Sequence, residues 1–147
     1  ALRTLALGAD GIVTQARWTS GLNQALSLWM FARQAWSGEG SLDPLLDDFF
    51  EGCYGPAASA MRAYFRYWHL RWLDFRGCFR GEALHALRLK GFQEFDRARS
   101  LLETAHSTPG IQPASLHRIQ QEISFLENAR HSWSFLALVD SGLLDSE

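Results

Sequence analysis

Residues 116–137 read LHRIQQEISFLENARHSWSFLA, and this stretch decides the fold class of the chain. Its apolar residues recur in alternating steps of three and four, at Leu116, Ile119, Ile123, Leu126, Trp133 and Ala137. Such spacing places side chains along one face of an α-helix, and Arg130 is the one polar break in the stripe. The stretch therefore predicts a long amphipathic helix.

A second helix is predicted just before this one. Its helical spacing is marked by Phe92, Phe95, Arg99, Leu102 and Ala105, and it ends in the turn sequence of residues 107–110, STPG. A short polar loop between two amphipathic helices favours an antiparallel pair. We expect a helical hairpin at the C-terminal end of the chain.

Residues 22–36 predict a helix with apolar side chains on more than one side. One stripe holds Leu22, Leu26, Trp29 and Trp36, and another holds Leu28, Phe31 and Ala35. A helix that is apolar nearly all round is typical of a buried element. We expect this helix to lie between two layers.

Asp43-Pro44 predicts the start of the next helix, over residues 44–54, with a capping carboxylate before a proline in the first turn. Asp47, Asp48 and Glu51 follow close to the positive end of the helix dipole. Their number would allow general acid/base chemistry, but a capping and dipole role explains them more simply. We expect a structural role.

Gly55-Pro56 ends that helix and opens another. The apolar residues of this third helix are Met61, Tyr64, Phe65, Trp68, Trp72 and Phe75. Arg62, Arg66 and His69 fall on its other face, where we expect solvent. Residues 82–90 predict a further short helix.

The first 21 residues have a different pattern. Residues 2–7 are apolar at helical spacing, and the β-branched run within residues 10–15, DGIVTQ, predicts a short strand followed by a loop over residues 16–21. Helix, strand, loop and helix in this order are typical of the closing unit of a parallel α/β fold. One strand cannot form a sheet, so either it lies alone on a helical body or its neighbours belong to a chain segment before Ala1.

Composition excludes several classes of protein. The 147 residues carry 14 basic and 16 acidic side chains, so the chain has no excess of positive charge for a nucleic acid or an anionic membrane. The apolar run 26–32 stops at Arg33, well short of the roughly 20 residues of a membrane span. Cys53 and Cys78 are too few for a disulfide scaffold, and the five histidines lack metal-ligand spacing. We expect no metal, no cofactor, no nucleic acid and no membrane.

Trp18 is the candidate binding residue. It follows the predicted strand, outside any helical stripe and close to Gln15 and Arg17. Loops at the C-terminal ends of strands carry the binding chemistry of α/β folds. An indole can stack on a sugar, while Gln and Arg can hydrogen-bond its hydroxyls or a carboxylate. The alternative is that Trp18 only fills the junction between the strand and the helix after it.

The sequence also resembles a known family. The resemblance is carried by residues 8–15, GADGIVTQ; by residues 42–50, LDPLLDDFF; and by residues 53–58, CYGPAA, followed by Met61 and Tyr64. These segments resemble domain of unknown function 4838, a bacterial glycoside-hydrolase-like family similar in architecture to the α-glucuronidases. Cys53 and the sequence WSGEG at residues 36–40 depart from the family pattern.

The resemblance implies a mainly α chain that begins with the last βα unit of a TIM barrel, residues 1–36, and continues as a C-terminal helical domain, residues 37–147. The chain opens on Ala1 rather than Met, and we expect it to be the end of a larger enzyme. The acidic catalytic pair would then lie on earlier strands, so no residue here is assigned as catalytic. Gln15, Arg17 and Trp18 would line the barrel mouth and contact an oligosaccharide or uronic acid. A secreted or periplasmic location would follow.

The rival interpretation is an autonomous helical module that binds another protein through exposed Trp and Phe faces. The two differ in one expectation. On the fragment interpretation, apolar surface around Ile12, Val13 and Trp29 lacks its barrel neighbours and is exposed.

Overall fold

A computed structural model of the chain describes residues 22–37, 41–74 and 93–140. Its elements, in chain order, are α2 (Leu22–Ser37), α3 (Leu42–Tyr54), the short 3₁₀ turn η1 (Gly55–Ala57), α4 (Ala58–Asp74), α6 (Gln93–His106) and α7 (Pro113–Asp140). The prediction of a mainly α fold is confirmed for these residues, which contain no strand. The predicted helices at 2–7 and 82–90, the strand at 10–15 and the loop at 16–21 lie outside the described residues. Of the predicted TIM-barrel unit, residues 1–36, only the helix is described, as α2.

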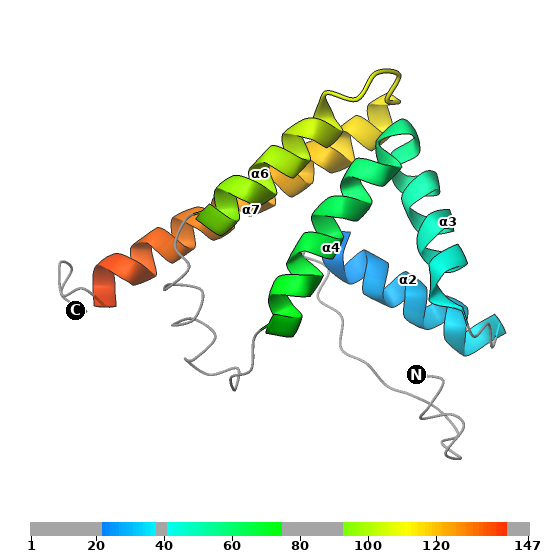
Figure 1. The fold of residues 1–147 in the computed structure, drawn as a ribbon, viewed down its shortest axis with the longest axis horizontal. Helices are drawn as coiled ribbons and strands as arrows, with labels where there is room; N and C mark the ends of the chain where they lie inside the picture. Colours follow the sequence, from blue (N-terminus) through cyan, green and yellow to red (C-terminus); the bar gives the residue numbers. More distant parts are fainter. Residues whose placement is uncertain (1–21, 38–40, 75–92, 141–147) are drawn as a thin grey trace, which may run out of the picture.

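The predicted C-terminal hairpin is present. α6 and α7 lie antiparallel along one another, joined by the turn after His106 (Figure 1). Gly110 in that turn has φ of 77°, which favours glycine. Arg130 Nη2 lies 3.1 Å from Asp96 Oδ1, and Arg99 of α6 also pairs with Glu127 of α7. Arg130, the polar break in the apolar stripe, therefore links the two helices at their surface, while their buried apolar residues pack in the core.

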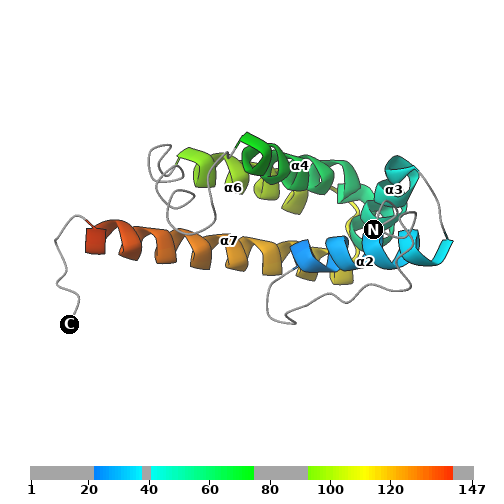
Figure 2. The same cartoon turned by 90° about the horizontal axis from the view of Figure 1, so that it is seen from below.

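The helices form two layers. Seen from below, α4 and α6 lie in one layer and α7 and α2 in the other, with α3 at one end (Figure 2). The core fills the space between α3, α4, α6 and α7. Its buried apolar residues are Leu45, Phe49, Phe50, Tyr54, Ala57, Met61, Tyr64, Phe65, Phe95, Ala98, Leu102, Ala105, Ile119 and Leu126. No described helix is long and apolar enough to span a membrane.

The turn between α3 and α4 requires a glycine. Gly55 has φ of 52° and ψ of −123°, a conformation in which a Cβ atom is strained, and Pro56 follows at the start of η1. This turn folds α4 back beside α3, so the predicted break at Gly55-Pro56 is confirmed. On α4, Met61, Tyr64 and Phe65 are buried as their spacing predicted.

Two expectations are wrong, one about where a helix begins and one about how a helix is packed. The predicted helix start at Pro44 lies two residues too late, because α3 begins at Leu42 with Ser41 as its N-cap. The helix α2 is not buried between two layers, since none of its described side chains is fully buried and Trp36 is 94% exposed. The physical reason is that, among the described helices, α2 packs mainly against α3 alone.

Trp29 is less exposed to solvent than the fragment interpretation predicts. Its indole is half-buried against the core, with its ring centroid 5.6 Å from that of Phe49. The contact with α3 therefore covers part of this side chain. Ile12 and Val13 lie outside the described residues.

Candidate functional site

The predicted sugar-contacting residues, Gln15, Arg17 and Trp18, lie outside the described part of the chain, so their roles stay predictions. Within the described ranges, no group of three or more His, Cys, Asp and Glu side chains could hold a metal ion. His69, His106, His117 and His131 are exposed there. Two other arrangements of polar and aromatic side chains stand out, one buried and one on the surface.

The buried arrangement lies where α3, α4 and α7 meet. Glu122 of α7 is 1% exposed, and it hydrogen-bonds with Tyr64 of α4. Tyr54, the last residue of α3, is fully buried beside them. A buried carboxyl is costly unless it is hydrogen-bonded, so the phenol of Tyr64 is part of what makes Glu122 tolerable here.

Electrostatics support this picture. Burial raises the pKa of Tyr54 and of Tyr64 far above the ordinary value of about 10, and the nearby Glu122 carboxylate adds to both shifts. Both phenols therefore stay protonated at physiological pH. Tyr64 hydrogen-bonds with Glu122, whereas the buried hydroxyl of Tyr54 has no hydrogen-bond partner among the described residues. The cluster is enclosed, and it has the character of a structural polar centre rather than a reaction site.

Arg118 of α7 contacts the C-terminal end of α3 at the same junction. Its Nη1 donates to the main-chain oxygen of Cys53, 3.0 Å away, in the last turn of α3. A cation at a helix C-terminus interacts favourably with the carbonyl groups there. Burial raises the pKa of the Cys53 thiol more than Arg118 lowers it, so the thiol is protonated and a poor nucleophile near neutral pH.

Sequence reasoning missed Glu122, although a signal was present. Ile119, Glu122, Leu126 and Ala129 also follow steps of three and four, and Ile119 and Leu126 are buried on the same seam. Leu116 and Ile123, on the stripe we predicted, are half-buried. A stripe chosen by apolar residues alone passes over a carboxylate that occupies a core position.

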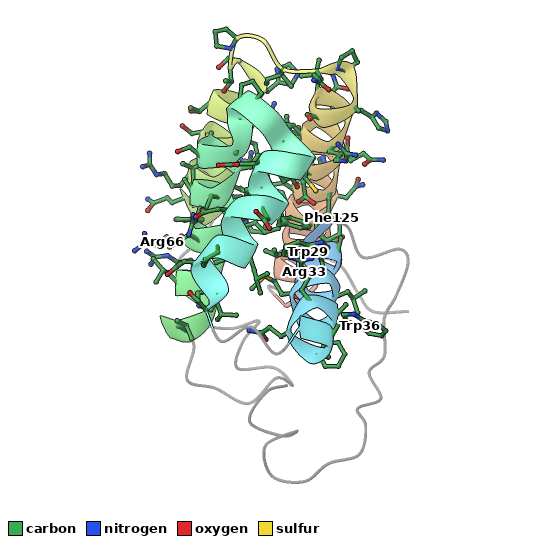
Figure 3. The ribbon with its side chains drawn as sticks, turned by 90° about the vertical axis from the view of Figure 1, so that its right-hand side faces the viewer. Trp29, Arg33, Trp36, Arg66 and Phe125 are labelled. Atoms are coloured by element: carbon green, nitrogen blue, oxygen red, sulfur yellow. The ribbon has the colours of Figure 1, made fainter. Side chains whose placement is uncertain are left out.

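The surface arrangement lies along α2. Trp29, Arg33 and Trp36 succeed one another along this helix (Figure 3). Their spacing of four and three residues puts them on one face. The Arg33 guanidinium lies over the Trp29 ring, 5.6 Å from its centroid, and its Nη2 is 3.9 Å from Asp48 Oδ2 of α3. The indole of Trp36, near the C-terminal end of α2, is almost fully exposed to solvent.

Three carboxylates of α3 form ion pairs with arginines, and the expectation of a capping carboxylate is wrong, because the N-cap is Ser41 and no side chain caps the helix. Asp48 pairs with Arg33, while Asp43 and Asp47 both pair with Arg62 of α4. Arg62 is therefore not simply solvated, because the α3 carboxylates lie within its reach across the turn. Arg66 is exposed, as its position predicted.

Comparison with protein-family models, with curated proteins and with solved structures finds no match to this chain.

Proposed function

We propose that the chain is the C-terminal helical part of a carbohydrate-active glycoside hydrolase, in which it packs against a barrel and contributes one edge of a sugar site. One observation carries the proposal. The segments that resemble the glycoside-hydrolase-like family, residues 42–50 and 53–58, form a helical corner whose apolar side chains belong to the core. That corner runs through α3 and the Gly55 turn into α4, with Phe49, Phe50 and Tyr54 buried.

The motif has a physical meaning in this fold. Tyr54 fills the junction with α7, and Gly55 supplies the positive φ that turns the chain. The following Pro56 suits the first turn of η1. These residues form the turn between two helices and carry no catalytic group, which is consistent with a structural role for them.

The chemistry of hydrolysis would lie elsewhere in the enzyme. Glycosidases use a pair of carboxyl groups on either side of the scissile bond. Among the described residues, Asp43, Asp47 and Asp48 of α3 pair with arginines, and Glu122 is closed off from solvent. Gln15, Arg17 and Trp18 are proposed to contact an oligosaccharide or uronic acid at the barrel mouth.

The coding sequence upstream of Ala1 tests this proposal directly. An open reading frame that encodes several further βα units supports it. A start codon immediately before Ala1 overturns it.

Calorimetry tests the proposed mouth residues. The polypeptide encoded by the complete frame is titrated with xylo-oligosaccharides and glucuronic acid, before and after Trp18→Ala. Binding that is lost in the variant supports the assignment. Unchanged binding removes Trp18 from the site. Phe125→Ala, at an exposed position of α7, serves as the control for nonspecific effects.

A second candidate function is a helical module that binds another protein. It is favoured by apolar side chains at the end of α4, where Leu70 and Leu73 are exposed, the latter by 60%. Together with Arg66 they follow a helical stripe of four and three residues. A start codon just before Ala1, combined with a self-contained monomer, is the outcome that would favour this candidate.

A further inference from the structure

The helix α7 has two overlapping faces that could pack on the core. The apolar face has no polar member and consists of Leu116, Ile119, Ile123 and Leu126. The buried face is the one that the structure encloses, and it consists of Ser115, Ile119, Glu122 and Leu126. Two of the four positions differ by one residue, which turns an α-helix by about 100°, so a rotation of roughly 50° separates the two faces.

The observed rotation of α7 is not the one that apolar burial favours. It encloses Ser115 and Glu122, which are 7% and 1% exposed, and it leaves Leu116 and Ile123 half-buried. Burying polar groups costs free energy, whereas enclosing two larger aliphatic side chains in their place would gain it. A specific contact must therefore stabilise the buried face.

A chain of hydrogen bonds from α4 supplies that contact. Trp68 and Glu122 both hydrogen-bond with the hydroxyl of Tyr64. An indole N–H can only donate, so the Tyr64 oxygen accepts from Trp68 and its own proton is directed to the Glu122 carboxylate. The donor therefore has a fixed orientation, and the observed rotation of α7 brings Glu122 within its reach.

The helices α3 and α6 act differently on α7. Arg118, one turn before Glu122, donates to the main-chain oxygen of Cys53 in α3, 3.0 Å away, and so favours the same rotation. The buried residues of α6 are all apolar, namely Phe95, Ala98, Leu102 and Ala105. The ion pairs between α6 and α7 join partly exposed side chains, and such pairs contribute little. The rotation of α7 therefore depends on its polar contacts with α3 and α4.

We propose that Glu122 fixes the rotation of α7 about its own axis, through its hydrogen bond with Tyr64. Without this bond, α7 turns toward its apolar face, which encloses Leu116 and Ile123 and moves Phe125 further from the core. Buried polar residues of this kind select one packing arrangement at a cost in stability. The inference rests on α3, α4 and α7 alone, so it is independent of which candidate function is right.

Nuclear magnetic resonance of the intact chain, with labelled Ile and Leu methyl groups and a soluble nitroxide, tests this inference. The nitroxide relaxes exposed methyl groups faster than enclosed ones. In Glu122→Leu, the relaxation of Leu116 and Ile123 should fall to the level of Ile119, which both faces enclose. Gln121→Leu is the matched control, because Gln121 is the exposed neighbour of Glu122 and its replacement should leave the pattern unchanged.

Two further variants separate the hydrogen bond from the size of the side chain. Glu122→Gln keeps an oxygen that accepts from Tyr64, so it should keep the relaxation pattern of the intact chain. Tyr64→Phe removes the donor and leaves the carboxyl, so it should shift the pattern in the same direction as Glu122→Leu.

Each outcome decides the matter. The inference is supported if Glu122→Leu and Tyr64→Phe shift the pattern while Glu122→Gln and Gln121→Leu do not. It is overturned by unchanged relaxation at Leu116 and Ile123 in Glu122→Leu, or by an equal shift in Glu122→Gln. Loss of the helical circular dichroism in Glu122→Leu would also overturn it, because Glu122 would then be required for folding rather than for the choice of face.

Discussion

The junction of α3, α4 and α7 and the helix α2 are both rich in aromatic residues, yet they are packed very differently. At the junction, the ring of Phe50 contacts those of Phe49, Tyr54 and Phe65 at centroid distances of 5.5, 6.0 and 5.4 Å. On α2, Trp29 touches Phe49 and Trp36 is bare. Aromatic content alone does not make a core, because the number of neighbouring elements decides how much surface is removed from water.

The largest effect is expected from removing a ring at the junction. Phe50→Ala should lower the free energy of unfolding by about 3–5 kcal/mol, because it removes a buried side chain and leaves a cavity. Phe125→Ala, on the exposed side of α7, should change it by less than about 0.5 kcal/mol. Urea denaturation measures both. Similar losses in the two variants would contradict the burial described for the junction.

The tyrosines give the junction a dependence on alkaline pH. The pKa values of Tyr54 and Tyr64 are raised in the folded chain, so above pH 10 the unfolded chain releases protons that the folded chain retains. Stability from these groups is complete below pH 10 and falls above it, by about 2.7 kcal/mol per pH unit for two residues. Urea denaturation between pH 9 and pH 11 measures the slope.

The control for this slope is the double variant Tyr54→Phe, Tyr64→Phe. It should flatten the decline in stability above pH 10. Cys53, whose pKa is also raised by burial, is unchanged in the control and contributes equally to both proteins. An unchanged slope in the double variant would show that other groups cause the alkaline loss.

The corner between α3 and α4 depends on one glycine. Gly55→Ala should destabilise the chain by about 1–3 kcal/mol, because alanine is strained at a φ of 52°. Gly52→Ala is the matched control, since Gly52 lies inside α3 with open space around its Cβ position. That change should stabilise by about 0.5–1 kcal/mol, through helix propensity. Thermal unfolding that shows the same sign for both would refute the assigned turn.

The smallest effects are expected on α2. Trp29→Ala should cost about 1–2 kcal/mol because one side of its indole rests on Phe49. Trp36→Ala should leave stability within about 0.5 kcal/mol, since the indole is bare. Equal losses in denaturant unfolding would mean that α2 is covered along its whole length.

The sequence was sufficient to predict the helices but not their surroundings. The spacing of Met61, Tyr64 and Phe65 revealed α4, and the polar turn before Gly110 revealed the α6–α7 hairpin. The same periodicity made α2 look buried, because a pattern of apolar residues shows which faces could be covered and not whether a partner is present.

The polar details were the least predictable. Glu122 was missed because its burial depends on Tyr64, which is 58 residues earlier in the chain. Arg62 was assigned to solvent, but its partners Asp43 and Asp47 come within reach only after the turn at Gly55. Ion pairs and buried hydrogen bonds between distant residues depend on the tertiary fold, which local spacing does not encode.

Hydrogen exchange of backbone amides tests the central claim, that a packed junction of α3, α4 and α7 carries a loosely attached α2. Amides in α2 should exchange at least about 100-fold faster than those around Phe50 and Tyr64, because opening α2 breaks few contacts. Equal protection of α2 and of the junction would contradict the claim.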